Sequence, residues 1–165
     1  MKLSEGVEAA IHCAAILAQM TEGDTLPGAA LAQAHGLSPS YLLKQLNALV
    51  AGGVLESISG PHGGYRLARP AEKITLLDVV LAVEGREPAF RCREIRRRGP
   101  TQLPTSVYIK PCGINAAMLK AERAYRAVLA ETSIADIVAG FEAEADPRSI
   151  DAVCAFVAQN RRPQA

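Results

Sequence analysis

Two pairs of side chains in this sequence have the chemistry to bind a metal centre, and the first pair is Glu8 and His12. They are four positions apart within VEAAIHC, so on a helix they would be neighbours on one face. A carboxylate and an imidazole at this spacing can ligate one metal, as the two histidines of a helical HExxH motif do. The pair lies at the edge of an apolar stripe, where a solvated polar pair is the alternative interpretation.

The second pair, Cys92 and Cys112, brackets an irregular segment. Three prolines lie between the two cysteines and favour a loop of ~15 residues or more, and loops of this length are usually functional or disordered. Thiolates at the two ends of such a loop can converge on one metal. Two thiolates alone are too few for a four-ligand site, and the helical pair would bring the number to four.

The remaining cysteines and histidines are given no metal-binding role. Cys13 is predicted to be a buried apolar residue, and Cys154 is assigned no function. His35 and His62 are predicted to lie at the surface.

Composition limits the kind of protein that can carry these residues. The chain has 165 residues, 49% of them hydrophobic, only 4% aromatic and none Trp, which indicates a helical core of Ala, Leu, Val and Ile. This length favours one domain, or a small domain with an appended dimerisation arm. No apolar run approaches the ~18 residues of a membrane span, and Glu5, Glu8 and His12 interrupt any signal peptide. We therefore expect a cytoplasmic protein without membrane contact.

The order of predicted elements is that of a winged helix-turn-helix. Helices are expected over residues 4–21, 28–35 and 39–51, then strands over 54–59 and 65–68, and a helix over 75–85. Glycines flank the short connection between the two strands, which indicates a hairpin. The fold class is thus mostly α with a small β-hairpin, followed by a long C-terminal dimerisation helix. The expected regions are a DNA-binding domain over 1–85, a metal-binding loop over 86–112, a dimerisation region over 113–141 and a tail over 142–165.

In a helix-turn-helix the first residues of the second helix enter the major groove of double-stranded DNA. The predicted DNA-contacting residues on this helix and on the hairpin are Ser38, Ser40, Tyr41, Lys44, Gln45, Ser59, His62 and Arg66. Residues 1–70 hold four basic and five acidic side chains, so a winged helix that binds protein instead of DNA is an alternative. Most of the acidic residues fall on the first helix and the turn after it, which favours DNA.

Six segments in this order resemble the iron–sulfur winged-helix transcriptional regulators, the family of IscR and NsrR. They are MKLSEGVEAAIHC, LSPSYLLKQLNAL, GPHGGYRLARP, ITLLDVVLAVEG, FRCREIR and PCGINAAM, and the resemblance covers about residues 1–140. Most cluster-binding members have three closely spaced loop cysteines, whereas this chain has two. With two loop cysteines and a Glu–His pair on the first helix, it is most similar to the RsrR type.

The resemblance implies a homodimeric DNA-binding regulator that senses redox state, nitric oxide or oxidants through a 2Fe–2S cluster at the dimer interface. Cys92 and Cys112 of one subunit would ligate one iron, and Glu8 and His12 of the other subunit would ligate the second. The DNA-binding domains of the two subunits would then face two DNA half-sites about one helical turn apart.

Two alternatives to the cluster stay open from the sequence. A Cys₂HisGlu set is also acceptable for zinc, and the two loop cysteines could act as a metal-free thiol sensor. An enzyme is not expected, because the sequence contains no nucleophile motif, no phosphate-binding loop with Lys and no recognisable pair of catalytic carboxylates.

Overall fold

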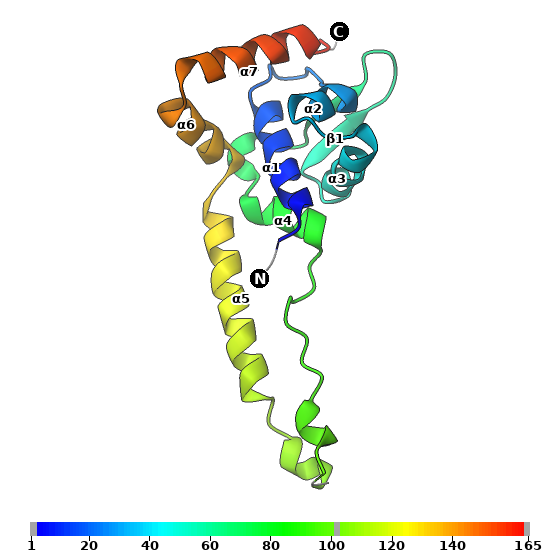
Figure 1. Ribbon diagram of the computed structural model, residues 1–165, viewed down its shortest axis with the longest axis vertical. Helices are drawn as coiled ribbons and strands as arrows, with labels where there is room; N and C mark the ends of the chain where they lie inside the picture. Colours follow the sequence, from blue (N-terminus) through cyan, green and yellow to red (C-terminus); the bar gives the residue numbers. More distant parts are fainter. Residues whose placement is uncertain (1–2, 101–102, 164–165) are drawn as a thin grey trace.

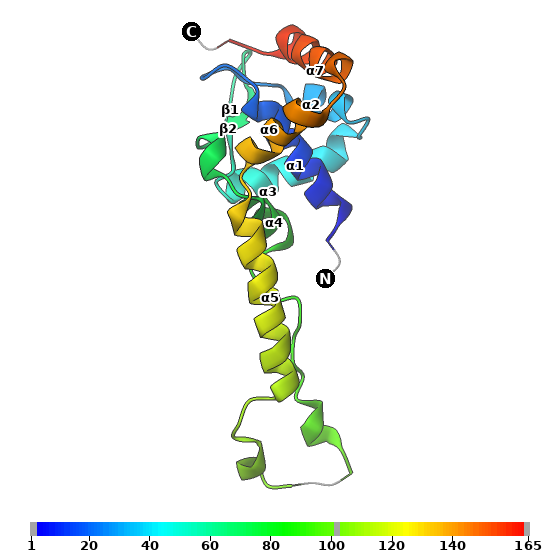
Figure 2. The ribbon, with the colours of Figure 1, turned by 90° about the vertical axis from the view of Figure 1, so that its left-hand side faces the viewer.

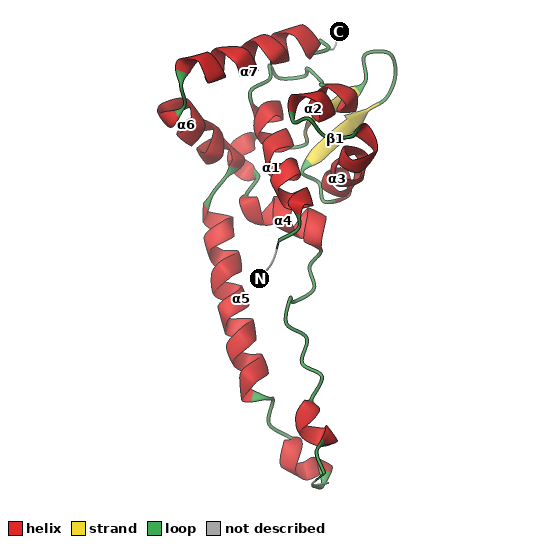
Figure 3. Ribbon diagram, in the orientation of Figure 1, coloured by secondary structure: helices red, strands yellow, loops and turns green. Residues whose placement is uncertain are grey.

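The computed structural model describes residues 3–100 and 103–163. It consists of a compact head, which contains both ends of the described chain, and a long stalk that projects from it (Figures 1 and 2). The head is mostly helical and carries one two-stranded sheet (Figure 3). This confirms the predicted fold class of a mostly α protein with a small β-hairpin.

Three helices form the first part of the head: α1 (Glu5–Ala18), α2 (Gly28–Ala34) and α3 (Pro39–Ala51). α3 begins as its sequence predicts, because the Ser38 side chain accepts a hydrogen bond from the Tyr41 amide and Pro39 occupies the first turn. Leucines spaced along α3 face α1 and α2, and burying them holds the three helices together. The fully buried side chains at this centre include Leu26, Leu31, Leu42, Leu46 and Leu49.

The wing follows α3 and consists of the antiparallel strands β1 (Leu55–Ile58) and β2 (Gly64–Leu67), paired from Leu55↔Leu67 to Ile58↔Gly64. The connection between them requires glycine, because a Cβ at Gly63 would lie 2.3 Å from the Ile58 carbonyl oxygen. The segment before α2 extends this sheet, since Leu26 pairs with Tyr65.

A short 3-10 helix, η1 (Ala71–Lys73), leads into α4 (Leu76–Glu84), and α6 (Ile134–Glu144) begins beside α4. Both α-helices start with a capping box, and a bridge between Thr75 and Ser133 ties the two starts together. Ile74 and Ile134 are fully buried at this junction. The junction therefore returns the chain from the stalk to the head.

The stalk consists of α5 (Gly113–Glu131) and the irregular segment that precedes it, which includes the 3-10 helices η2 (Ile95–Arg98) and η3 (Thr105–Tyr108). Nineteen residues of α5 span about 28 Å at 1.5 Å per residue. Near the head, the buried Glu122 carboxylate accepts a hydrogen bond from the Ala89 amide at 3.0 Å and pairs with Arg126 at 2.6 Å. This contact fixes the outgoing limb of the loop against α5.

The C-terminal part differs from the expected boundaries. The predicted dimerisation region over 113–141 divides at Thr132: α5 forms the stalk, whereas α6 packs on α1 in the head. The tail contains a full helix, α7 (Pro147–Asn160), which lies across the top of the head in Figure 1 and buries Val157 in the core. In the described part of the chain, no helix is long and apolar enough to cross a membrane.

Candidate functional site

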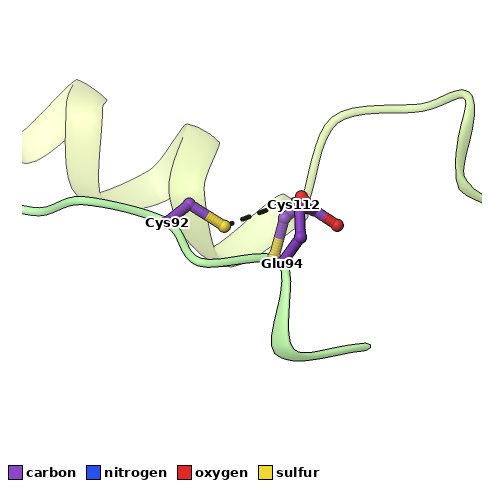
Figure 4. A group of neighbouring side chains, drawn as sticks. All are labelled: Cys92, Glu94 and Cys112. Atoms are coloured by element: carbon purple, nitrogen blue, oxygen red, sulfur yellow. Dashed lines mark hydrogen bonds between the residues drawn. The ribbon is translucent and has the colours of Figure 1, made fainter. Parts of the chain in front are cut away.

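The two loop cysteines meet at the end of α5 that points away from the head. Cys92 lies on the outgoing limb, and Cys112 is the N-cap of α5. The ligand atoms of Cys92, Cys112 and Glu94 all lie within 4.8 Å of one another (Figure 4). The Cys92 thiol also donates a hydrogen bond to Glu94 Oε1 at 3.6 Å. The long loop therefore folds back so that two thiols and one carboxylate converge, as the metal interpretation of this loop requires.

Glu94 is held in an uncommon backbone conformation. Its φ is +46°, in the left-handed region, where a residue other than Gly is uncommon. The Arg96 guanidinium bonds Glu94 Oε2 at 2.8 Å and also the Lys110 carbonyl at 3.3 Å, so it joins the two limbs of the loop. The Tyr108 hydroxyl donates to the Arg96 carbonyl at 3.2 Å. These contacts hold the loop closed around the cysteines.

The surroundings of Cys112 favour its thiolate. Hydrogen bonds from the backbone amides of Asn115 and Ile114, at the start of α5, and the nearby charge of Arg96 lower the pKa of the Cys112 thiol. A helix N-terminus stabilises an anion in the same way. Because the thiolate is the form that binds metals, this arrangement suits Cys112 for ligation. In contrast, burial raises the pKa of the Cys13 thiol to about 12, and this side chain lies in the core as predicted.

Glu8 and His12 are far from the cysteines of the same chain. Both are exposed on α1 in the head, one helical turn apart. Cys112 lies at the end of α5 away from the head, so most of the length of this helix separates the two pairs (Figures 1 and 2). One chain therefore presents both predicted ligand pairs but does not bring them together.

His35, which was predicted to lie at the surface, is half-buried beside His12, with ring centroids 5.3 Å apart. Burial, and to a lesser extent the charge of His12, lowers the pKa of His35. Its Nε2 atom is buried without a hydrogen-bond partner among the described residues. A surface depression of about 420 Å³ connects this region to α3, and its lining includes Glu8, His12, His35 and Tyr41. The candidate ligands on α1 are thus neighbours of a predicted DNA-contacting residue.

The start of α3 and its outer face carry half of the predicted DNA contacts. Ser38, Ser40 and Lys44 are exposed, and Tyr41 is half-buried. Gln45 differs from the prediction, because it is only 6% exposed and its side-chain amide lies under α1 against Gly6. It points to the core instead of the groove, since position 45 falls on the inner face of α3 next to Leu46 and Leu49.

The predicted contacts on the wing are placed at its tip and on its outer strand. Ser59 and His62 are exposed in the connection between the strands. Arg66 is engaged within the protein, because its guanidinium pairs with Glu56 at 2.7 Å and bonds the Gly23 carbonyl at 3.4 Å. A contact from Arg66 to DNA would therefore compete with an existing ion pair.

Sequence reasoning did not single out three residues that lie beside the candidate ones. Leu43 and Asn47 are exposed on the same helix as Lys44, and Leu43 is 49% exposed. An apolar side chain here can contact a thymine methyl group, and an amide can bond adenine. Glu94 was also missed, although its position two residues after Cys92 was a signal. Only the fold of the loop shows that its carboxylate turns toward the sulfur atoms.

A helix-turn-helix with a wing, a stalk and a cysteine-bearing loop defines the class of winged-helix transcriptional regulators. Residues 3–140 match the Rrf2 family, described as "Iron-dependent Transcriptional regulator", and the chain belongs to this family. It is 34% identical over 137 residues to the HTH-type transcriptional regulator YffB of Lactococcus lactis, covering 83% of this chain and 86% of the relative. It is 33% identical over 144 residues to the HTH-type regulator Rv1287 of Mycobacterium tuberculosis, covering 85% and 83%. These relatives are regulators and not enzymes, as expected for this chain.

Solved structures have the same fold. IscR of T. potens superposes with a TM-score of 0.64 at 21% identity, covering 88% of this chain and 93% of that chain. CymR, the global cysteine regulator of B. subtilis, superposes with a TM-score of 0.62 at 22% identity, covering 84% and 97%. Both comparisons support the winged-helix architecture with C-terminal helices.

Proposed function

We propose that this chain is a homodimeric regulator whose affinity for DNA depends on a 2Fe–2S cluster shared between subunits. Cys92 and Cys112 of one subunit would hold one iron, and Glu8 and His12 of the other subunit would hold the second, as in regulators of the RsrR type. The observation that carries this proposal is the convergence of two thiols at the end of α5 away from the head, where their own chain offers Glu94 but neither Glu8 nor His12.

The residues fit such a cluster in donor chemistry and in charge. Two adjacent sulfur donors suit iron of an iron–sulfur centre, and the cationic side chains at the loop favour an anionic group. Glu8 and His12 are exposed and therefore available to a second chain. When bound, a 2Fe–2S cluster supplies one-electron redox chemistry.

The stalk supports a dimer because it carries apolar side chains that its own chain leaves uncovered. Ile114 is 66% exposed and Val128 is 62% exposed on α5. Several exposed apolar side chains on one helix indicate a surface that another protein covers. Pairing of two such helices would bury these side chains and bring each loop toward the other subunit. A two-fold symmetric dimer would also present two α3 helices to two DNA half-sites.

Within the head, the proposed metal ligands on α1 lie close to the proposed DNA-contacting residues on α3. Glu8 and His12 share a surface depression with Tyr41 on α3. A change in the position of α1 would therefore shift the DNA-contacting helix α3, since α1 and α3 pack directly on each other. Ser38, Ser40 and Lys44 on α3, with Ser59 and His62 on the wing, are the residues we propose to contact DNA.

A mixed dimer tests the shared site. One subunit carries Glu8→Ala and His12→Ala, and the other carries Cys92→Ser and Cys112→Ser; the two bear different affinity tags and are purified together without oxygen. If ligands come from both subunits, one of the two sites stays complete and the dimer retains about half of the wild-type iron, sulfide and visible absorption. If each site is built within one subunit, the mixed dimer contains neither a complete site nor iron.

The homodimers are the controls for this experiment. The wild-type dimer is expected to contain about two irons and two sulfides per subunit, and each parent mutant homodimer none. A colourless wild-type protein with stoichiometric zinc would contradict the cluster and support the zinc alternative, because Zn²⁺ has no visible absorption of its own.

A second candidate function is a thiol switch, and the proximity of the two sulfur atoms favours it. The Cys92 and Cys112 thiols would together give two electrons and two protons to hydrogen peroxide, so that one disulfide forms and the peroxide is reduced to two waters. In metal-free protein, hydrogen peroxide would then change DNA affinity, and Cys92→Ser would abolish the change while Glu8→Ala would not. Equal responses of both variants would contradict this switch.

A further inference from the structure

The tip of the wing, residues 59–63, is held by residues that lie far from it in the sequence. Three successive carbonyls of this tip accept hydrogen bonds from outside the hairpin. The Thr25 hydroxyl donates to the His62 carbonyl at 3.0 Å. Arg162 Nη1 donates to the Pro61 carbonyl at 3.0 Å and to the Gly63 carbonyl at 2.9 Å. The conformation of the tip therefore depends on more than its own turn residues.

The backbone around Arg162 places its guanidinium beside the tip. Thr25 and Arg162 pair as an antiparallel bridge, with N–H···O distances of 3.1 and 2.8 Å. The next residue, Leu26, pairs in turn with Tyr65 of β2 at 3.0 and 2.8 Å. The C-terminal segment is thus an additional edge of the sheet that forms the wing, which gives Arg162 a defined position against the hairpin.

The C-terminal segment is anchored independently of the Arg162 side chain. The neighbouring Arg161 guanidinium pairs with the buried Asp24 carboxylate at 3.0 Å and bonds the Thr21 hydroxyl at 3.3 Å. Val157 of α7 is buried in the core. Removing the guanidinium of Arg162 should therefore leave α7 and the segment after it in place.

The chemistry of these contacts suits a DNA-binding tip. Backbone carbonyls carry partial negative charge and repel phosphate, while a guanidinium with several donors can bind and neutralise carbonyls on one side of a loop. With these carbonyls bonded to Arg162 and Thr25, the exposed side chains of Ser59 and His62 are presented on a fixed backbone. Because the tip is already ordered in the free protein, DNA binding does not have to supply the free energy for ordering it.

We propose that Arg162 is a positioning residue of the DNA-binding wing: by bonding the Pro61 and Gly63 carbonyls, it fixes the tip in the conformation that meets the phosphate backbone. Residues 3–140 are the part of the chain that matches the Rrf2 family, so α7 and Arg162 lie outside the matched region. The inference rests on the DNA contact proposed for the wing and is independent of the metal centre.

The test compares Arg162→Met, which keeps the length of the side chain and removes its donors, with Arg162→Lys, which restores a cationic donor. Arg148→Met is the matched control, since Arg148 lies on α7 with 89% of its side chain exposed. The DNA is a duplex of roughly 30 base pairs selected from a random pool by the wild-type protein, long enough for two half-sites. Hydrogen exchange of amides 59–66, DNA affinity, its salt dependence and the unfolding midpoint are measured for each variant.

Arg162→Met is expected to speed hydrogen exchange at the wing tip and to weaken DNA binding about three- to tenfold, the effect of losing one or two modest hydrogen bonds. The slope of log affinity against log salt should stay unchanged, Arg162→Lys should recover most of the affinity, and Arg148→Met should behave as wild type. A slope reduced by about one, with unchanged exchange at the tip, would overturn the proposal, because Arg162 would then contact phosphate itself.

The Lys44→Gln variant separates this inference from the proposed DNA surface. If Lys44→Gln weakens binding and Arg162→Met does not, the positioning role is wrong while the proposed contact of α3 holds. If neither variant changes the affinity, both the positioning role and the proposed DNA surface are wrong.

Discussion

The thiols of Cys92 and Cys112 lie within 4.8 Å of each other at the start of α5, although twenty positions separate them in the sequence. A Glu94 carboxylate oxygen also lies within 4.8 Å of both sulfur atoms. Two different ligand sets can include this pair: one is completed by Glu8 and His12 of a second subunit, and the other includes Glu94 of the same chain. They differ in which carboxylate is essential.

Glu94→Gln is expected to leave iron binding intact, because the proposed cluster takes its carboxylate from Glu8 of the other subunit. The measurement is iron and sulfide content with the visible spectrum of protein purified without oxygen, and Glu87→Gln on the same exposed segment is the control. A Glu94→Gln protein as iron-free as Cys112→Ser would contradict this expectation, because Glu94 would then be required as a ligand or as the partner of Arg96 that closes the loop.

Lys44→Gln is expected to weaken DNA binding by a similar factor for every duplex tested. Lys44 is exposed on α3, and a Lys that contacts phosphate contributes affinity but little base discrimination. Fluorescence anisotropy over a range of salt concentrations should show a slope smaller by about one. Lys73→Gln, an exposed change of equal charge on η1, serves as the control and should keep the wild-type slope.

Glu122→Ala is expected to destabilise the base of the stalk by about 1–3 kcal/mol, because it removes the acceptor for the Ala89 amide and the partner of Arg126. Chemical denaturation measures the loss, and hydrogen exchange should rise most in residues 86–92. Glu131→Ala, exposed at the end of the same helix, should change neither quantity appreciably. Unchanged exchange in residues 86–92 would mean that the loop limb is held by other contacts.

Asp136→Asn is expected to lower stability at neutral pH and to have little effect at low pH. Hydrogen bonds from the Ser133 side chain and backbone hold the pKa of the Asp136 carboxyl below its ordinary value of 3.8. A group with a depressed pKa stabilises the folded state above its unfolded pKa, and this contribution is lost as the pH falls through the folded pKa. The difference in unfolding midpoint between wild type and variant should therefore close below about pH 4. A difference that is constant down to pH 2 would contradict this origin.

Much of the head could be predicted from the sequence because local signals define it. Ser38 and Pro39 mark the start of α3, and the glycines between the strands mark the wing, since caps and turns act through residues close together in the chain. The spacing of Glu8 and His12 likewise places both on one exposed face of α1.

Other features depended on contacts between distant parts of the chain. Position 45 falls next to the leucines of the inner face of α3, and the packing against α1 showed that the Gln45 side chain lies against Gly6 in the core. Residues 142–165 were expected only as a tail, whereas they contain α7 and their pairing with Thr25 adds an edge to the sheet of the wing.

The sequence by itself determined the chemistry: two thiols, a carboxylate and an imidazole as candidate ligands, on a winged helix-turn-helix of the Rrf2 family. The tertiary structure decided which of these groups meet. The loop brings Cys92 to Cys112 and adds Glu94, while the rigid length of α5 keeps them away from Glu8 and His12 of the same chain. The reason is physical: helix periodicity is local and can be read from neighbouring residues, but the closure of a long loop depends on its whole set of contacts.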